Sequence, residues 1–373
     1  MTPTTRAEND VRREGIFETL RSEIRSGKYR AAVRFPSETA LARRFACSRQ
    51  SVVHALMSLQ DLGLLRRERG AGTFLTRKAQ LYGSSVGLIM SCIGSGEIFP
   101  PICRELLRLS QSEGLTLLLG ADASDSADAG AARALELAQR FVESKVAGVI
   151  FQPMEYYRES ERCNREIVSV FERAKIPVVL IDRDIVPTPR RSPYDVVGIN
   201  NFSAGRRLAQ HLVECGASRV RFLLKPQCAA TVLERMIGAQ SVLGADGSFP
   251  LEADPSDVRA IGEAVRGRHG ADAFICGNDA IAVRLLATLR KLGRRVPDDV
   301  LVAGVDDVAF AALASPPLTT VRQPCAAIAH EAFTRLLSRI EDPDQVPREC
   351  CLDAPLVVRA STQRKKGERG CRR

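Results

Sequence analysis

A short polar run, Ser48-Arg49-Gln50-Ser51, opens an apolar pattern in the stretch FACSRQSVVHAL. Arg49 can donate two parallel hydrogen bonds to guanine O6 and N7, and Gln50 can pair in a similar way with adenine. Ser48 and Ser51 suit contacts with phosphate oxygens or base edges. A helix that begins here also presents free N–H groups and partial positive charge to a phosphate. These four residues are candidates for DNA recognition, and the alternative is an ordinary solvated helix start.

Helical and strand-like patterns around this run indicate how it is positioned. A first amphipathic pattern over 16–24 ends at Gly27, and a second begins after Ser37, which can act as its N-cap. A third begins after Ser48 and carries apolar residues at helical spacing, so we expect one buried face. The sequence LLRRERGAGTFLT (64–76) then predicts a β-hairpin with a basic, glycine-rich tip. Three helices followed by such a hairpin predict a winged helix-turn-helix.

The stretch PSETALARRFACSRQSVVHALMSLQDLGLLRRERGAGTF (36–74) resembles the DNA-binding domain of the GntR family in its glycines, caps and apolar positions together. The resemblance implies that Thr39 in the second helix, and Arg69 and Gly70 at the hairpin tip, also contact DNA. Val53 departs from the family, which often has a DNA-contacting arginine at this position. We expect that contact to be absent or supplied by His54, for which an ordinary surface position is the alternative.

Positive charge is concentrated at the two ends of the chain, whose net charge is +10. Residues 1–83 carry 16 Lys or Arg against 8 Asp or Glu, and residues 364–373 carry 6 against 1. The remainder carries 32 against 35. A basic head on a nearly neutral body indicates a polyanion-binding module joined to a domain with another role. The basic tail is expected either to contact nucleic acid or to be a solvated end.

The composition favours a cytoplasmic protein that needs no cofactor. No apolar run of 18 or more residues predicts a membrane span, and the polar N-terminus does not resemble a secretory signal. The 11 cysteines are scattered and form no C-x-x-C pair, which indicates free thiols in a reducing compartment. Adjacent Cys350 and Cys351 could instead be redox-active. The sequence has no P-loop, G-x-S-x-G, H-E-x-x-H or metal-binding histidine spacing, so we expect neither catalysis nor a metal.

Beyond a polar stretch over 77–85, which we expect to be a linker, apolar runs alternate with amphipathic segments. VGLIM (86–90), IPVVLID (176–182) and VLVAGVD (300–306) are examples of these runs. The alternation predicts strands and helices in turn, and hence parallel sheets in an α/β body. Because the body has about 280 residues, two lobes are favoured over one.

The body resembles the effector-binding core of the LacI/GalR family, which is related to periplasmic sugar-binding proteins. The matching stretches include VVGINNFSAGRRLAQHLVECG, FICGNDAIA, VPDDVLVAGVDD and PPLTTVRQP, in the order and spacing of the family. The resemblance implies two doubly wound lobes joined by strand crossovers, with a ligand bound between them. No hinge helix of the usual LacI type lies between Thr76 and Gly87, so coupling to the head is expected to work differently.

Carried over onto this chain, the sugar contacts of the family fall on Phe99, Asp182, Arg235, Asn278, Asp306 and Gln323. Carboxylate and amide groups can bind adjacent hydroxyls of a polyol, arginine can donate a fork, and an aromatic ring can stack on a sugar face. Alternatives stay open for some of these residues. Asp182 and Asp306 could be loop-capping carboxylates, Asn278 could be a helix N-cap, and Phe99 could be a buried core ring.

Together these features predict a ligand-responsive transcriptional regulator, a homodimeric repressor of carbohydrate genes that binds a double-stranded DNA operator and a sugar or sugar derivative. The expected organisation is a winged helix-turn-helix over 1–76, a linker over 77–85, a two-lobed effector domain over 86–362 and a basic tail over 363–373. One alternative is a sugar-binding protein without a regulatory role, against which the basic head and the missing signal peptide argue. Another is an enzyme body such as an aminotransferase, but only the LacI-like motifs are present.

Overall fold

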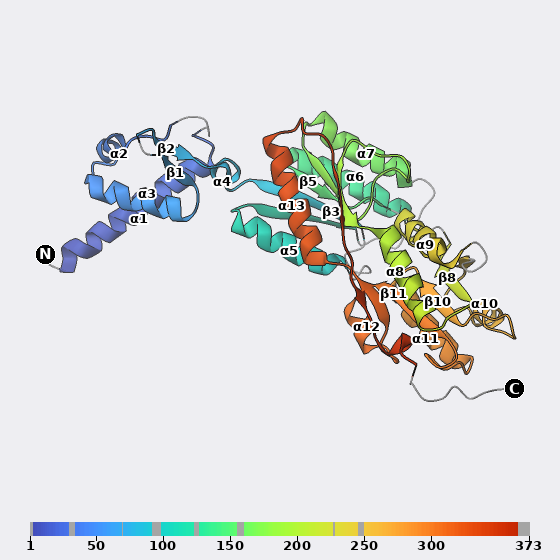
Figure 1. Cartoon of the computed structure of the whole chain (residues 1–373). Coiled ribbons are helices and arrows are strands. Elements are labelled where there is room, and N and C mark those ends of the chain that lie inside the picture. The colour runs from blue at the N-terminus through green and yellow to red at the C-terminus, as the bar shows by residue number, and fades with distance from the viewer. Residues whose placement is uncertain are drawn as a thin grey trace. The chain divides into compact units, whose positions relative to one another are not determined.

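The computed structural model describes residues 3–29, 34–68, 70–91, 98–122, 127–154, 160–226, 228–244 and 250–364 (Figure 1). The chain forms two compact units. The first comprises residues 1–87 together with 107–118 and 144–147, and the second comprises the rest of the chain. Among the described helices, none combines the length and the apolar character needed to cross a membrane.

The head consists of three helices and an antiparallel hairpin, as the sequence predicts. Its elements are α1 (Pro3–Arg25), α2 (Glu38–Arg44), α3 (Arg49–Asp61), β1 (Leu65–Glu68) and β2 (Gly72–Leu75). Ser37 Oγ accepts a hydrogen bond from Ala40 N at 3.2 Å, and Ser48 Oγ accepts one from Ser51 N at 3.2 Å. Both predicted N-caps are confirmed, and each satisfies an N–H group that the first helical turn leaves without a partner.

An apolar core holds α1, α3 and the hairpin together. Leu20, Val52, Leu59 and Leu64 are completely buried within it. Because the apolar residues of α1 and α3 recur at helical spacing, each helix turns one stripe inward. The opposite side of α3, which includes Arg49 and Gln50, is left to solvent.

The segment 77–85, predicted as an unpatterned linker, is partly helical, and that prediction needs correction. Helix α4 (Arg77–Leu81) is N-capped by Thr76, whose Oγ1 accepts a hydrogen bond from Ala79 N at 3.3 Å. Ala79 is buried in the core of the head. A helix this short shows no apolar periodicity in the sequence, because one buried alanine does not make a stripe.

The body folds into two lobes, each built on a six-stranded sheet. In the first lobe the strand order is β13-β7-β6-β5-β3-β4. Its strands are β3 (Ser85–Ser91), β4 (Thr116–Asp122), β5 (Val149–Phe151), β6 (Val178–Ile181), β7 (Asp195–Ile199) and β13 (Glu349–Leu352), and its helices are α5 (Phe99–Ser112), α6 (Ala127–Glu143), α7 (Ser160–Arg173) and α13 (Cys325–Glu341). All residues of β5, β6 and β7 are buried. Strands covered on both faces appear in the sequence as continuous apolar runs rather than as alternating ones.

The second lobe has the strand order β14-β12-β11-β10-β8-β9. Its strands are β8 (Val220–Leu224), β9 (Pro250–Glu252), β10 (Ala273–Cys276), β11 (Leu301–Asp306), β12 (Thr319–Arg322) and β14 (Leu356–Val357), and its helices are α8 (Asn201–Glu214), α9 (Ala230–Leu243), α10 (Val258–Ala264), α11 (Asp279–Lys291) and α12 (Ala309–Leu313). The chain crosses between the lobes after β7, after β12 and after β13. The predicted pair of doubly wound lobes with strand crossovers is therefore confirmed.

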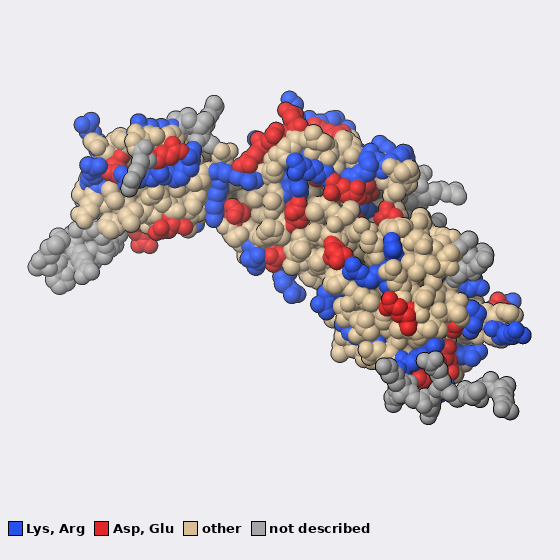
Figure 2. Space-filling model, in the orientation of Figure 1, with Lys and Arg blue, Asp and Glu red and all other residues tan. Residues whose placement is uncertain are grey.

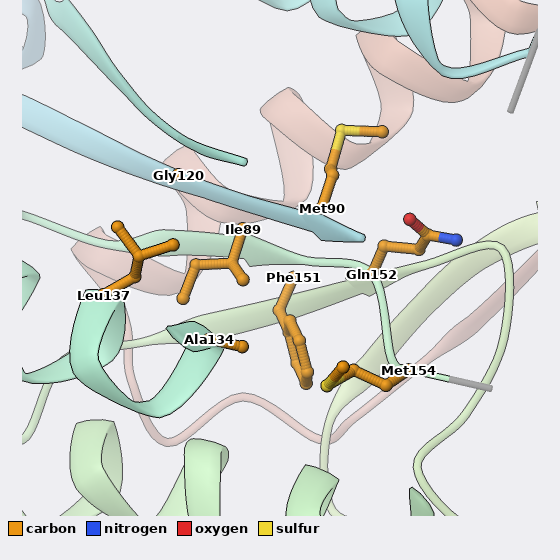
Figure 3. Close-up of a pocket in the computed structure, with 8 residues that line it drawn as sticks. All are labelled: Ile89, Met90, Gly120, Ala134, Leu137, Phe151, Gln152 and Met154. Carbon is orange, nitrogen blue, oxygen red and sulfur yellow. The ribbon is translucent and has the colours of Figure 1, made fainter. Parts of the chain in front are cut away.

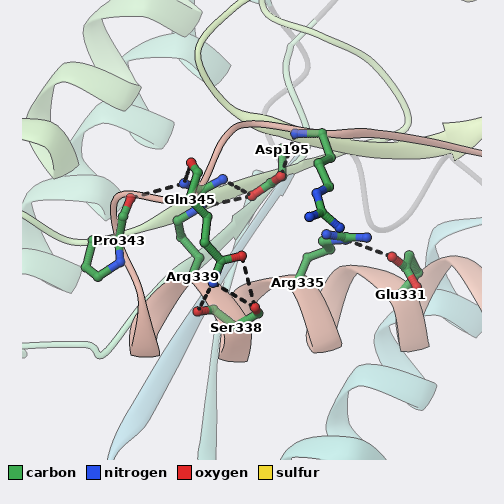
Figure 4. Close-up of polar contacts among 8 residues, drawn as sticks. Asp195, Glu331, Arg335, Ser338, Arg339, Pro343 and Gln345 are labelled. Carbon is green, nitrogen blue, oxygen red and sulfur yellow. Dashed lines mark hydrogen bonds and ion pairs between the residues drawn. The ribbon is translucent and has the colours of Figure 1, made fainter.

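A buried ion pair joins α13 to β7 in the first lobe (Figure 4). Arg339 Nη2 in α13 lies 2.7 Å from Asp195 Oδ2, and Asp195 Oδ1 accepts a hydrogen bond from Arg348 N at 2.8 Å. Asp195 opens β7 and Arg348 immediately precedes β13, so one carboxylate ties together α13, β7 and β13. Asp195 is 3% exposed, and loss of either partner would leave an uncompensated buried charge.

A very small cavity lies inside the first lobe, between Ile89, Phe151 and Met154 (Figure 3). Its volume is about 10 Å³. A space of this size holds at most about one water molecule. A ligand larger than a water molecule therefore does not fit in this cavity.

Two glycines allow α8 and α9 to pack backbone against backbone. A Cβ atom at Gly205 would overlap the carbonyl oxygen of Arg235, and one at Gly238 would overlap that of Phe202. Any larger residue would have to push the two helices apart, because a close-packed interior cannot absorb the added volume. The close approach also brings Arg235 of α9 to Asn201 at the start of α8.

Replacing Gly205 with alanine should destabilise the second lobe by about 1–3 kcal/mol or more, the usual cost of overpacking. Gly15→Ala is the matched control, because a Cβ there meets nothing within 4 Å on an exposed helical surface. The control should gain up to about 1 kcal/mol, since alanine favours the helix over glycine. Denaturant unfolding followed by circular dichroism measures both changes. A Gly205→Ala variant as stable as the original protein would contradict the packing described here.

Candidate functional site

The predicted DNA-contacting side chains of the helices lie around the starts of α2 and α3. Thr39, Ser48, Arg49 and Gln50 are exposed. Ser51 is buried, and its hydroxyl lies 2.9 Å from that of Ser48. The structure therefore presents the first four residues to solvent, whereas the Ser51 hydroxyl faces the N-cap.

The side chain of Glu38 links the start of α3 to the hairpin. Arg49 Nη2 lies 2.8 Å from Glu38 Oε2, and Arg67 Nη2 lies 3.1 Å from Glu38 Oε1. Neither Glu38 nor Arg67 was predicted as a site residue from the sequence. Both stand in the segment that resembles the GntR family, but the side of the hairpin on which Arg67 lies depends on the register of β1 with β2.

The hairpin turns at a glycine that is open to solvent. Gly70 is exposed and has a φ of 78°, in the left-handed region that glycine adopts without steric cost. Arg69, predicted as a contact beside it, lies outside the described residues. His54 is exposed and Val53 is half-buried, so His54 is the better placed of the two for an external contact. Figure 2 shows basic side chains with acidic ones among them on the visible face of the head.

In the second unit, a cluster of charged side chains forms where the two lobes meet. Arg235 is 4% exposed; its Nε donates to Asn201 Oδ1 at 2.8 Å, and its Nη1 donates to Gly277 O at 2.7 Å. Asp182 follows β6 of the first lobe, and Asp306 ends β11 of the second. The positive charge of Arg235 acts on the pKa of both aspartates. The structure thus brings together three of the predicted ligand residues, Asp182, Arg235 and Asp306. Asn201, which was not predicted, belongs to the same cluster.

Gln323 also belongs to this cluster. Its Nε2 donates a hydrogen bond to Asp306 Oδ1 at 2.9 Å, and its side chain is buried. Asp306 has a φ of 123° and Asp182 a φ of 71°. A positive φ is uncommon for residues other than glycine, and such strained positions are concentrated at functional sites.

The carboxylates of the cluster are crowded and poorly hydrated. Burial raises the pKa of Asp182 to about 7, an effect that Arg235 opposes and that Asp306 and Glu234 reinforce. Burial raises the pKa of Asp306 as well, against the effects of Arg235 and of the Gln323 hydrogen bond. Asp182 also accepts a hydrogen bond from Arg183 Nε at 3.0 Å. Burial is therefore the main cause of both shifts, because it disfavours the ionised form of each carboxyl group.

Asp279 adds a completely buried carboxyl group to this region. Its Oδ1 accepts a hydrogen bond from Thr320 Oγ1 at 2.6 Å, and its Oδ2 accepts one from Val308 N at 3.1 Å. Burial and the charge of Asp306 raise the pKa of Asp279 to about 8. The group braces the loop after β11, which carries Asp306.

Two predicted ligand residues have local structural roles. Asn278 Oδ1 accepts a hydrogen bond from Ile281 N at 2.9 Å and caps α11, the alternative that the sequence left open. Phe99 is the first residue of α5, and its ring is buried at 7% exposure. Among the contacts between described residues, neither side chain bonds to Asp182, Arg235 or Asp306.

A polar pocket of about 360 Å³ adjoins the cluster at Asp182. The second lobe contributes Phe202, Thr231 and Glu234 to its lining, and none of these residues was predicted. Thr188 Oγ1 of the first lobe donates a hydrogen bond to Glu234 Oε1 at 2.6 Å. Both lobes therefore line the pocket, and this bond connects them. Its volume is in the range of small-molecule sites.

Comparison with known proteins places both parts of the chain. Residues 12–75 match the gntR family of bacterial regulatory proteins, and residues 209–362 match the periplasmic binding protein-like domain family. The chain is 26% identical over 364 residues to the arabinose metabolism transcriptional repressor of Geobacillus stearothermophilus, covering 93% of this chain and 96% of that protein. It is 30% identical over 244 residues to an uncharacterized HTH-type transcriptional regulator of Streptomyces limosus, covering 62% of this chain and 67% of the relative.

A solved structure supports the same fold. The transcriptional regulator CelR in complex with cellobiose has a TM-score of 0.62 and 22% identity, with 88% of this chain and all of that chain covered. The chain belongs to the HTH-type transcriptional regulators, with a gntR-family head and a periplasmic binding protein-like body. Both family resemblances drawn from the sequence are confirmed.

Replacing Asp306 with asparagine should make the melting temperature less dependent on pH. The folded pKa values of Asp182, about 7, and Asp279, about 8, lie above that of an unfolded aspartate. The stability that these groups contribute is therefore fully present below about pH 4 and is lost as the pH rises through 7 and 8. Removing the Asp306 charge lowers both pKa values, and asparagine keeps the oxygen that Gln323 binds.

Melting curves of the full chain between pH 5 and pH 9 measure this effect. Asp344→Asn is the control for the loss of one negative charge, because Asp344 is exposed and lies away from the cluster in sequence. The control should retain the pH dependence of the original protein. An Asp306→Asn variant with that same dependence would show that the three carboxyl groups are not coupled as described.

Proposed function

We propose that this protein is a sugar-responsive repressor in which the head, over 1–76, binds a DNA operator and the two lobes, over 86–362, bind the effector. The observation that carries this proposal is the presence in one chain of an exposed, N-capped recognition helix and a buried inter-lobe charge cluster. The first suits a polyanion, and the second suits a small polar ligand. The similarity to a repressor of arabinose metabolism over nearly the whole chain supports control of carbohydrate genes.

In this proposal the start of α3 enters the major groove. Arg49 and Gln50 read base edges, and Thr39 and Ser48 bind phosphate oxygens. Gly70, and Arg69 beside it, contact the minor groove from the hairpin tip. Because such regulators bind as symmetric dimers, two heads would bind the two halves of a pseudo-palindrome.

The effector in this proposal is an uncharged polyol. Asp182, Asp306 and Gln323 would accept and donate hydrogen bonds to adjacent hydroxyls, and Arg235 would donate from the opposite side. A uronate or a sugar phosphate would bring a further charge into a buried space where desolvation already disfavours ionised carboxylates. Effector binding would shift the lobes between two arrangements and so weaken the binding of the heads to the operator.

Separate substitutions should divide the two activities. Arg49→Ala should weaken operator binding by about tenfold or more, because a bidentate base contact is worth about 1–3 kcal/mol. It should leave sugar binding unchanged. Asp306→Ala should abolish the sugar response and preserve binding of DNA in the absence of sugar. Fluorescence anisotropy with labelled DNA and calorimetry with sugar measure the two separately, and identical phenotypes for the two variants would refute the division of labour.

A thermal-shift panel tests the class of effector. A ligand that binds only the folded protein raises its melting temperature, by an amount that grows with concentration relative to Kd. Pentoses, hexoses and uncharged disaccharides such as cellobiose should include the stabilising ligands, whereas the matching uronates and sugar phosphates should not stabilise. The Asp306→Ala variant is the control for binding at this site. Stabilisation by a sugar phosphate alone would overturn the assignment of an uncharged effector.

A further inference from the structure

The carboxylate of Glu38 holds two exposed arginines that come from different elements of the head. The side chain of Glu38 is 15% exposed, whereas those of Arg49 and Arg67 are 71% and 62% exposed. Arg49 also donates from Nε to Glu38 Oε2 at 2.8 Å, so two of its nitrogens engage the same oxygen. The acid is therefore largely covered by its own cationic partners, while their outer surfaces stay open to solvent.

The position of Arg67 follows from the alternation of a β-strand. Successive side chains of β1 point to opposite sides, so Arg66 and Glu68 share one side and Leu65 and Arg67 the other. Arg66 accordingly pairs with Glu68, and its guanidinium lies 5.4 Å from the ring centroid of Phe74. Arg67 lies on the side that faces Glu38 and, through it, the start of α3. Two adjacent arginines thus have different surroundings.

The cluster of Glu38, Arg49 and Arg67 carries a net charge of +1 and stands at the N-terminal end of α3. The helix adds partial positive charge and free N–H groups at that end. A DNA strand brought to this surface would therefore meet two guanidinium groups close together. Arg49 lies in the recognition helix and can read a base edge. Arg67 lies outside that helix, so it is placed to bind the DNA backbone beside the same base.

We propose that Arg67 is a DNA-contacting residue that binds a backbone phosphate next to the base read by Arg49, and that Glu38 is the positioning residue that holds both arginines in place. This inference rests on the proposed function of the head and extends it to two residues. Glu38 faces a polyanion, where a negative charge by itself weakens binding. Its contribution is to restrict two long, flexible side chains before DNA arrives, which lowers the entropy lost on binding.

Binding of the full-length chain to two duplexes tests the contact made by Arg67. One duplex is selected by the original protein from a randomised pool, and the other has a random sequence. Arg67→Ala should weaken binding to the selected duplex by about tenfold and make the salt dependence shallower by about 1 in the log–log slope, as expected for one lost phosphate contact. The preferred bases should be unchanged. Arg67→Lys should recover most of the affinity, because lysine also binds phosphate.

Arg66→Ala is the matched control, since it removes the same charge from the neighbouring position of the same strand. It should change the affinity by no more than about twofold, because its partner is Glu68 on the other side of the strand. Equal losses in Arg66→Ala and Arg67→Ala would overturn the proposed contact, since general charge would then explain both. Failure of the original protein to select any sequence would instead contradict the proposed function of the head.

The role of Glu38 has its own readout. Glu38→Gln removes a negative charge, so binding to the random duplex should become stronger, as charge alone requires. Binding to the selected duplex should not gain in proportion, and the ratio of selected to random affinity should fall by about tenfold. An unchanged ratio would show that Glu38 does not position the arginines. If Glu38→Gln melts below the assay temperature, the same ratio measured for Glu38→Asp decides, because the shorter side chain keeps the charge but should lose the positioning.

Discussion

The inter-lobe region depends on one buried cation, the guanidinium of Arg235. A charge that is 4% exposed has to be compensated within the protein, and an uncompensated one would be strongly destabilising. Asn201 and Gly277 accept its hydrogen bonds, and two aspartates supply negative charge. For these contacts α9 has to lie directly against α8, which Gly205 and Gly238 make possible. The requirement of one side chain therefore extends to the packing of two helices.

The two aspartates near Arg235 lie at strand ends with an irregular backbone. Asp182 and Asp306 both have positive φ, a conformation that costs free energy for any residue with a Cβ atom. Asp306 is held there by Gln323 and by the loop that Asp279 braces. The strained backbone of Asp306 is thus stabilised by contacts with Gln323 and with the loop that follows β11. A site built in this way is already organised before a ligand binds, which reduces the cost of ordering it.

Most of the fold was predictable because its signals are local. The N-caps at Ser37 and Ser48 need only the residues of one helical turn, and strands buried on both faces appear as uninterrupted apolar runs. Helix α4 was missed because its single buried alanine depends on a core made elsewhere in the chain. The cap that Asn278 forms on α11 is local as well, and the sequence left it open beside the ligand role that the family resemblance implies.

The site residues also divide into those that the sequence predicted and those that depend on tertiary contacts. Arg235, Asp182, Asp306 and Gln323 were predicted from a resemblance, and the structure brings them together. Asn201, Glu234, Glu38 and Arg67 were not predicted, because each acquires its partner only when two separate elements meet. Their chemistry is ordinary for surface residues when the sequence is considered alone. Such side chains are found from tertiary geometry rather than from motif or spacing.

The two charge clusters of the chain are built on opposite principles, and this difference bears on the ligand proposed for each. In the head, one carboxylate serves two exposed arginines, so the surplus is positive and faces solvent. Between the lobes, the buried arginines Arg183 and Arg235 meet carboxyl groups whose pKa values burial raises, so opposite charges compensate one another in a poorly hydrated space. The first arrangement attracts a polyanion over a distance. The second disfavours a further charged group and suits hydroxyl groups that can satisfy buried acceptors and donors. In the proposed function, a nucleic acid and a neutral polyol are therefore bound by one chain without competing for either site.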